Sequence, residues 1–339
     1  MPLSKFLARI CAIVVCLAAV LPAFAQDTIQ SLYEAAKTEG KLVYWGSPDT
    51  RTAALLKDRF KAKYPGIEID LFKIQPAPAI ERIIEAASAG RAVVDVMDSQ
   101  LAYLELLFDR KMVVSYPWVQ NFQIDPTRVL FDGRALTLWH LDTPLAINTG
   151  LVKAGEIKSW DDLLDPKWRR KLIVEARGFS FAILALKWSE TRAFDYLKSI
   201  MALNPIITKG GTATIEALSG GQGAVGIGAY AGIVEQFKDA GAPIDWVRVG
   251  PVPTAFGALL QLANAPHPNA ARLWMHFMMS QEAHDAIYEG MGLDIVYGRN
   301  VGPLGAKYQA SSLEVVPESF DLSKMKALIA RAAAAIGSL

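Results

Sequence analysis

The sequence predicts an α/β protein made of two similar lobes. Three observations support this fold class: a length of 339 residues, short apolar runs that alternate with segments of helical periodicity, and two long extended stretches that divide the alternation into two series. Strands that alternate with helices at this pace are typical of a parallel sheet covered on both faces. At roughly 150 residues per domain, the chain has room for about two such units.

Apolar, β-prone runs and turn residues define the first series. Pro65 and Gly66 end one helical segment, and Gly90 ends the next. Apolar side chains recur at helical spacing between the runs. The pattern predicts strands at 41–45, 67–72 and 93–97 and helices at 53–64, 80–87 and 101–108.

The second series begins after Gly150 and repeats the same order. The turn at 177–180 and the Gly210-Gly211 pair each precede a helical segment. The alanine-rich last helix could pack on either lobe. The predicted elements are strands at 172–175 and 224–227, helices at 181–188, 213–218 and 322–336, and extended passages between the lobes at 136–147 and 246–262.

The first 25 residues are predicted to be a signal peptide that is removed on export. Lys5 and Arg9 precede an apolar run at 10–21, and Ala23 and Ala25 supply the small residues that signal peptidase reads. The run is shorter than the ~20 residues that a helix needs to span a bilayer. We therefore expect cleavage after Ala25 and a periplasmic location.

Composition excludes several classes of protein. Cys11 and Cys16 both lie in the signal segment, so the mature chain can form neither a disulfide nor a Cys metal site. Removal of the signal leaves 314 residues with 33 basic and 34 acidic side chains, a formal net charge of −1. A nucleic-acid binder normally has a strongly basic face, which this balance does not favour.

The order of several motifs resembles a known family. The motifs lie at 43–47, 60–67, 92–96, 223–228 and 265–283. Together with the signal peptide they resemble the bacterial extracellular solute-binding proteins of ABC importers, and most closely the iron(III)-type branch. The resemblance covers almost the whole mature chain.

The resemblance implies a type II periplasmic binding fold, in which two Rossmann-like lobes are joined by two hinge crossovers. Lobe 1 would comprise 26–140 and 250–310, and lobe 2 would comprise 141–249 and 311–339. The implied function is capture of a small solute in the cleft between the lobes and its release to an ABC permease in the inner membrane. We expect a monomer with no cofactor, no catalytic residues and no nucleic-acid partner.

Several side chains at predicted strand ends and helix starts are candidates for ligand contact. Arg177 and the neighbouring helix N-termini favour an anion, because the guanidinium makes charge-assisted hydrogen bonds and the unpaired N–H groups at a helix start attract negative charge. Each candidate also has a structural explanation as a core ring, a helix cap or half of an ion pair. The predicted ligand contacts are Trp45, Ser47, Ser99, Trp139, Arg177, Ser180, Thr212, Tyr230 and Tyr297. We expect a small organic anion such as a carboxylate, a phosphonate or a phosphate ester.

An iron(III) site is the first alternative. The iron-binding branch implies a pair of adjacent tyrosines, whereas this chain has Tyr230 between two alanines. A hard trivalent cation needs several anionic oxygen ligands, so His140, Asp142 or a bound anion would have to complete the site. We therefore expect no metal and keep iron as a second hypothesis.

Two further alternatives concern the class of protein. A ligand-loaded partner of a membrane sensor would share every pattern described above. A periplasmic hydrolase has the least support, because the sequence contains no GxSxG elbow and no zinc signature. We expect packing or surface roles for His267, His276 and His284, and either an ion pair or a ligand contact for Asp294 and Arg299.

Overall fold

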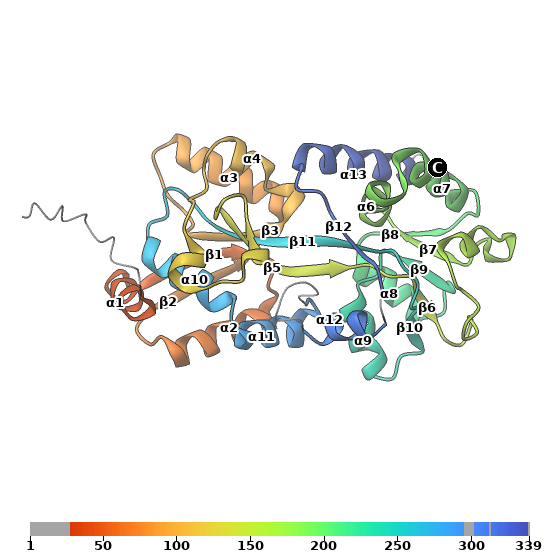
Figure 1. Cartoon of the computed structure of the whole chain (residues 1–339), viewed down its shortest axis with the longest axis horizontal. Helices are drawn as coiled ribbons and strands as arrows, with labels where there is room; N and C mark the ends of the chain where they lie inside the picture. The colour runs from red at the N-terminus through yellow and green to blue at the C-terminus, as the bar shows by residue number, and fades with distance from the viewer. Residues whose placement is uncertain (1–27, 295–301, 312, 338–339) are drawn as a thin grey trace, which may run out of the picture.

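The computed structural model describes residues 28–294, 302–311 and 313–337. It contains two β-sheets that are covered by helices and joined by long strands (Figure 1). The predicted signal peptide, Tyr297 and Arg299 lie outside the described residues. The prediction of an α/β protein with two lobes is confirmed.

The larger sheet has seven strands in the order β2-β1-β3-β11-β5-β4, with β12 beside β11. Strands β2, β1 and β3 run parallel, whereas β11 is antiparallel to both β3 and β5. The strands are β1 (Lys41–Gly46), β2 (Glu68–Lys73), β3 (Val96–Gln100), β4 (Val129–Leu130), β5 (Ala135–Asp142), β11 (Val252–Gln261) and β12 (Val315–Pro317).

Helices cover both faces of the larger sheet. Along β1, Leu42 and Tyr44 point into the core on one face, and Val43 and Trp45 point into the core on the other. This alternation follows from the two-residue period of a strand. The first face carries α1 (Ile29–Glu39), α2 (Thr50–Lys63), α10 (Pro268–Met278) and α11 (Gln281–Met291), and the second carries α3 (Pro76–Ser88), η1 (Leu101–Tyr103) and α4 (Glu105–Asp109). Two short helices, α5 (Trp118–Phe122) and η2 (Pro126–Arg128), precede β4.

The smaller sheet has five strands in the order β10-β6-β9-β7-β8. Ile173 packs toward one face of this sheet, and Leu172 and Val174 pack toward the other. The strands are β6 (Ala146–Asn148), β7 (Leu172–Glu175), β8 (Ile206–Thr208), β9 (Val225–Ile227) and β10 (Ile244–Trp246). One face carries η3 (Trp160–Leu164), η4 (Pro166–Trp168), α6 (Phe179–Trp188) and α7 (Glu190–Met201), and the other carries α8 (Gly211–Ser219), α9 (Ala231–Asp239) and α12 (Pro303–Ala310).

The strands β5 and β11 form the connection between the two sheets. They pair antiparallel and extend through the middle of the molecule in Figure 1, between the larger sheet and the smaller one. The chain passes from β5 into β6 and returns from β10 into β11, so these strands are the two predicted crossovers. The last helix, α13 (Leu322–Gly337), contacts η1 on one side and α6 and α7 on the other. It therefore packs against elements of both sheets.

Several predicted boundaries differ from the structure; helices α2 and α3, for example, begin three and four residues earlier than predicted. Strand β3 begins at Val96, because the preceding Asp95 carboxylate accepts hydrogen bonds from the backbone N–H of Val43 and His267 at 2.7 and 2.6 Å. The helix predicted at 101–108 is divided into η1 and α4 at Leu104. Helix α6 begins two residues earlier than predicted, directly after Gly178, whose φ of 69° is left-handed.

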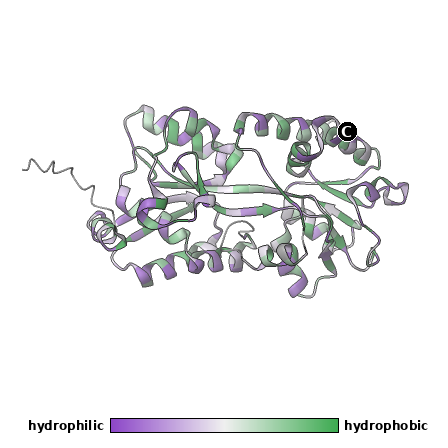
Figure 2. Ribbon diagram, viewed as in Figure 1, coloured by the Kyte–Doolittle hydropathy of each residue, from purple (hydrophilic) through white to green (hydrophobic). Residues whose placement is uncertain are grey.

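Hydropathy follows the layers of the fold. Apolar residues, green in Figure 2, occupy the strands and the inner faces of the helices, and hydrophilic residues, purple in the same figure, lie on the outer faces. Within the residues described above, no helix combines the length and apolar character needed to cross a membrane. The lobe boundaries at 140, 249 and 310 stay predictions.

Candidate functional site

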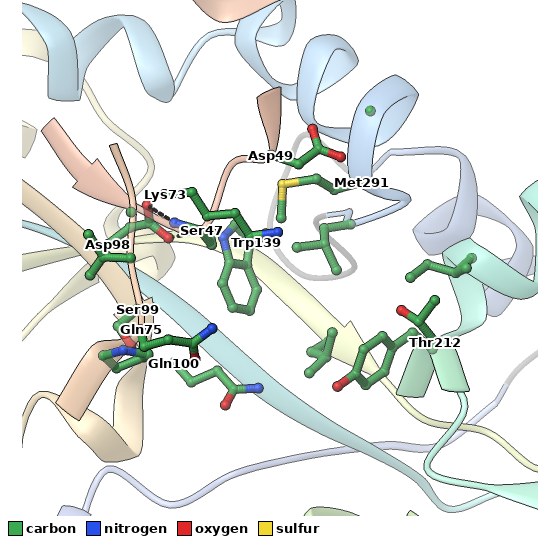
Figure 3. Close-up of a pocket in the computed structure, with 18 of the residues that line it drawn as sticks. Ser47, Asp49, Lys73, Gln75, Asp98, Ser99, Gln100, Trp139, Thr212 and Met291 are labelled. Atoms are coloured by element: carbon green, nitrogen blue, oxygen red, sulfur yellow. Dashed lines mark hydrogen bonds between the residues drawn. The ribbon is translucent and has the colours of Figure 1, made fainter. Parts of the chain in front are cut away.

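A cavity of about 560 Å³ lies between the two sheets, beside the connecting strand β5. This volume lies within the range of roughly 300–1,000 Å³ that is usual for small-molecule sites. Figure 3 shows polar side chains around it from both sides of the molecule. The first wall, from the larger sheet, includes Ser47, Asp49, Lys73, Gln75, Asp98, Ser99, Gln100 and Trp139. The second wall, beside the smaller sheet, includes Arg177, Thr212, Tyr230, Ile233 and Gln236.

The buried carboxylate of Asp98 organises the first wall. Asp98 follows the buried residues Val96 and Met97 of β3 and is 1% exposed. Its Oδ1 accepts hydrogen bonds from the Tyr44 hydroxyl and from the Ser47 N–H at 3.0 Å, and its Oδ2 accepts from the Ser47 hydroxyl at 2.5 Å. Burial raises the pKa of Asp98, and the hydrogen bonds from Ser47 and Tyr44 offset part of that rise.

Gly46 makes this network possible. A Cβ atom at this position would lie 1.8 Å from Asp98 Oδ1 and 2.8 Å from the Tyr44 ring. The parallel strands β1 and β3 end together at this edge, which brings residues 46–47 and 98–99 side by side. The pairing of β1 with β3 therefore determines the geometry of the first wall. Its carboxylate, Asp98, already accepts three hydrogen bonds.

Arg177 is the central side chain of the second wall. Its Nε donates to Glu175 Oε1 at 2.8 Å, and its Nη2 donates to the Tyr230 hydroxyl. Burial lowers the pKa of Arg177, but Tyr230 and Glu175 outweigh that effect and raise it. The Glu175 side chain is 5% exposed, whereas the Arg177 side chain is 39% exposed and lines the cavity. A guanidinium has five N–H donors, so Arg177 keeps donors available for a ligand.

The start of α8 lies next to this cation. Gly210, its N-cap residue, has no side chain to bond the first turn, and Thr212 of that turn lines the cavity. A Cβ on Gly211 would lie 2.5 Å from the Tyr230 ring, so glycine allows the ring to pack against the helix end. Burial raises the pKa of Tyr230, while Arg177 opposes that rise. The Gly211 N–H bonds the Tyr230 hydroxyl, and the other N–H groups of the first turn and the helix dipole favour negative charge here.

Lys73 and Asp49 add opposite charges to the first wall. Lys73, at the end of β2, is exposed and makes no ion pair or side-chain hydrogen bond with any residue that the structure describes. Asp49 caps α2 by accepting a hydrogen bond from the Thr52 N–H at 2.8 Å. The positive end of α2 stabilises this carboxylate.

Trp139 forms the floor between the walls. It lies in β5, is 4% exposed, and faces Gly257 of β11. A Cβ on Gly257 would lie 2.1 Å from the indole, and the strand register shifts between Gly257 and Ala258. The glycine therefore lets the indole lie against the β11 backbone.

Comparison with known proteins identifies the family. The family model described as "Bacterial extracellular solute-binding protein" matches residues 45–285. The chain belongs to this family. No curated protein matches the sequence. The resemblance noted from the sequence motifs is confirmed, and the family comprises the substrate-binding components of ABC transporters.

Solved structures of periplasmic binding proteins share the fold of this solute-binding protein. Iron-bound HitA from Pseudomonas aeruginosa has 16% identity and a TM-score of 0.68, covering 86% of this chain and 99% of its own. AfuA from Actinobacillus pleuropneumoniae, with fructose-6-phosphate bound, has 20% identity and a TM-score of 0.68, covering 86% and 97%. The Atu4243–GABA receptor has 16% identity and a TM-score of 0.71, covering 88% and 98%. At these identities the likeness shows the fold alone.

Most of the predicted contacts of the solute-binding protein line the cavity. Their role in binding stays a prediction. The residues that the structure brings together there are Ser47, Ser99, Trp139, Arg177, Thr212 and Tyr230. Trp45 and Ser180 do not line it, and Tyr297 lies outside the described residues.

Strand alternation and the start of α6 explain why Trp45 and Ser180 lie outside the lining of the cavity. Trp45 points to the face of β1 that α3 covers, where the Arg82 guanidinium lies 5.0 Å from the ring centroid. Ser180 is the second residue of α6 and is 3% exposed. Its hydroxyl is 2.9 Å from that of Thr143, so it fixes α6 to the segment after β5.

The residues that would have to supplement an iron site lie elsewhere. His140 is buried against the Phe256 ring, 5.0 Å between centroids, and burial lowers its pKa. Asp142 accepts a hydrogen bond from the Thr254 hydroxyl at 2.6 Å. Neither residue lines the cavity. Across the described ranges, no group of three or more His, Cys, Asp or Glu residues is placed to hold a metal ion.

The remaining histidines pack within the solute-binding protein. His267 Nδ1 lies 2.9 Å from Asp95, and His284 Nε2 lies 2.8 Å from the Arg128 guanidinium. The His276 ring packs against Phe122 at 5.2 Å between centroids. Burial lowers the pKa of His276 to about 4 and that of His284 to about 3. None of the three lines the cavity.

Sequence reasoning missed several residues of the cavity, all but one of them polar. Those in the first wall follow strands that were predicted, and the rule that ligands bind at the carboxyl ends of parallel strands could have found them. Gln236 and Met291 follow no such rule, because helices α9 and α11 deliver them from both sides. The missed residues are Asp49, Lys73, Gln75, Asp98, Gln100, Gln236 and Met291.

Proposed function

We propose that this solute-binding protein captures a small organic anion, such as a carboxylate, a phosphonate or a phosphate ester, and delivers it to an ABC permease. One observation carries the proposal: the half-exposed Arg177 and the start of α8, whose N-cap Gly210 has no side chain, face the cavity from one wall, and Lys73 faces it from the other. A ligand with two polar ends would contact both walls at once. Charge-assisted hydrogen bonds are roughly twice as strong as neutral ones, so they would dominate recognition.

The mechanism that follows is closure about β5 and β11. A ligand that contacts both walls favours the closed arrangement by its difference in affinity for the two states. The permease would then distinguish the loaded protein by the shape that closure produces. We expect saturating ligand to lower the radius of gyration measured by small-angle scattering. An unchanged radius at saturation would contradict closure.

A binding panel tests the ligand class. Protein unfolded in denaturant, dialysed free of retained solute and refolded would be titrated by calorimetry with fructose-6-phosphate, succinate, inorganic phosphate, GABA and ferric citrate. We expect at least one metal-free anion to bind with a Kd below about 100 μM and to raise the melting temperature. Binding of ferric citrate alone would overturn the organic-anion proposal in favour of iron.

The cellular setting follows from the predicted signal peptide. We propose a monomer in the periplasm whose mature chain begins at Gln26. Mass spectrometry of material from the periplasmic fraction would give the N-terminus, and light scattering would give the molar mass. Affinity capture of membrane partners would identify a permease, whereas capture of a sensor alone would favour the receptor alternative.

A further inference from the structure

A second cavity of about 320 Å³ adjoins the ligand cleft. We call it the side groove. It lies where α3, η1 and α4 meet α6 and α13, so elements associated with both sheets form it. Its lining is mainly apolar and includes Ala77, Ile80, Ala102, Leu106, Phe179 and Ile329.

The cleft and the side groove share a boundary one residue thick. Tyr103 lines both cavities. At the start of α3, Pro76 lines the cleft and Ala77 lines the groove. At the start of α6, Arg177 lines the cleft and Phe179 lines the groove, with the guanidinium 5.7 Å from the ring centroid. A molecule held by Arg177 would enter the groove if it extended past Tyr103.

The groove differs from the cleft in chemistry. Two of its three charged lining residues pair, since Lys326 Nζ lies 3.2 Å from Glu105 Oε2, and the Ser323 hydroxyl also donates to Glu105. The third, Glu81, is exposed and adds a negative charge, so the groove does not attract an anionic head. Two large side chains of the lining stay accessible: Tyr103 is 38% exposed and Leu106 is 40% exposed. Covering such surface is favourable without any specific hydrogen bond.

We propose that the solute is an amphiphilic anion, with its charged head in the cleft and an alkyl or aryl tail in the side groove. This inference rests on the proposed function and narrows its ligand class. The observation that decides the class is that the cleft with its anion-binding wall and the apolar groove share Tyr103 as a lining residue. A tail in the groove would touch α3 and α4 on one side and α6 and α13 on the other, so it would add to the contacts that favour closure.

A homologous ligand series tests the tail. The refolded protein would be titrated with monoalkyl phosphates and with unbranched carboxylates whose chains run from two to eight carbons. Each methylene that enters the groove should tighten the Kd about fourfold, until the groove is full. Running both head groups separates the effect of the head from that of the tail.

Two matched variants locate the tail. Ala330 is exposed on α13 and lines the groove, whereas Ala334 is exposed one turn further along α13 and does not line it. Ala330→Trp should fill the groove, so the gain per methylene should fall to about onefold while the Kd of the shortest anion stays within twofold. Ala334→Trp should keep the full gain of the wild type.

The outcomes separate this inference from the function on which it rests. Short anions that bind while longer ones gain nothing would overturn the tail and leave the proposed function intact. A gain per methylene that persists in Ala330→Trp would place the tail elsewhere and would also overturn the inference. Failure of every metal-free anion, short or long, would overturn both proposals together.

Discussion

The two walls of the cleft place their charges in opposite ways. In the first wall the Asp98 carboxylate is buried, and Tyr44 and Ser47 already donate to it. In the second wall Arg177 is half-exposed, and its partners Glu175 and Tyr230 leave guanidinium donors free. We infer that the first wall mainly stabilises the folded structure of the cleft, and that the second wall supplies most of the affinity for the ligand. Variants of each wall should therefore affect different measurements.

Asp98→Asn should have the largest effect, and that effect should fall on stability. The amide would place a donor against groups that already donate, and it would leave buried polar atoms unpaired. We expect the free energy of unfolding to fall by about 3 kcal/mol, a cost typical of broken buried networks. Urea unfolding followed by circular dichroism gives the value.

Tyr44→Phe serves as the graded control for the first wall. It removes one donor from the same carboxylate, so it should cost about 1–2 kcal/mol. The folded fraction of either variant should bind the anion with a Kd within about threefold of the wild type. A much larger loss of affinity would show that the Asp98 network, and not only Lys73, recognises the ligand from the first wall.

Removal of Arg177 should have the next largest effect, and that effect should fall on affinity. Arg177→Ala alone would leave the buried Glu175 carboxylate without its partner, so the informative variant is Glu175→Gln with Arg177→Ala. We expect roughly 50-fold weaker anion binding, in line with the loss of charge-assisted hydrogen bonds. The free energy of unfolding should change by about 1 kcal/mol or less. Calorimetric titration and urea unfolding of the same preparation measure both quantities.

The single variant Glu175→Gln controls for the partner. It keeps the Arg177 charge at the cavity, so its Kd should stay within about threefold of the wild type. Equal losses of binding and stability in the double variant would assign Arg177 to structure instead.

A third carboxylate, that of Glu318, shows how burial acts on a carboxylate that lacks most of the hydrogen bonds of Asp98. Glu318 is 3% exposed, much like Asp98, but it accepts a single hydrogen bond, from the Phe256 N–H at 2.5 Å. Its Oε2 has no partner among the residues that the structure describes. Burial raises its pKa from 4.5 to about 8, and the Phe256 hydrogen bond only partly offsets the rise.

The sign of the pH effect follows from that pKa. Between about pH 4.5 and 8 the folded chain holds a proton on Glu318 that the unfolded chain has released, so stability is greatest at the acid end and falls as the pH rises. The contribution of this group is about 1.4 kcal/mol per pH unit. Glu318→Gln should flatten the slope of unfolding free energy between pH 5 and 8 by that amount.

Asp142 supplies the comparison for this titration. Burial raises its pKa to about 7, with an added contribution from Asp294, so it gives a slope of the same sign that ends one pH unit lower. Asp142→Asn should therefore leave the slope above pH 7 unchanged. A slope that is identical in wild type and Glu318→Gln would show that Glu318 is ionised in the folded chain.

The sequence predicted the elements of the fold better than the residues of the cleft. Hydrophobic periodicity and Gly or Pro punctuation depend on neighbours in the chain, so helices such as α2 and strands such as β7 could be predicted from local pattern. The serines at 47 and 99 could also be found, because they follow strands whose carboxyl ends meet. These signals are local, or need only the rule for parallel sheets.

Contacts between residues far apart in the sequence determine the features that the local pattern could not predict. Tyr44 and Trp45 are both aromatic, so alternation alone could not show which of them faces α3. Gly178, the N-cap residue of α6, lies against α13, far along the chain, where a Cβ would be 2.6 Å from the Ala332 side chain. The side groove, formed by five helices, left no sequence signal of its own.

Tyr230→Phe should have the smallest effect of the series if the ligand is an organic anion. The Tyr230 hydroxyl accepts a hydrogen bond from Arg177, and burial keeps the pKa of its phenol raised. Loss of this hydroxyl would free the guanidinium slightly and remove one neutral partner, so the anion Kd should change by about threefold. An iron site would respond differently, because the phenolate oxygen would be a direct ligand and its removal would abolish ferric binding. A threefold change in the Kd of succinate or fructose-6-phosphate would support the second wall as an anion site. If Tyr230→Phe lost all binding while Arg177 was still present, the phenol and not the guanidinium would carry the affinity.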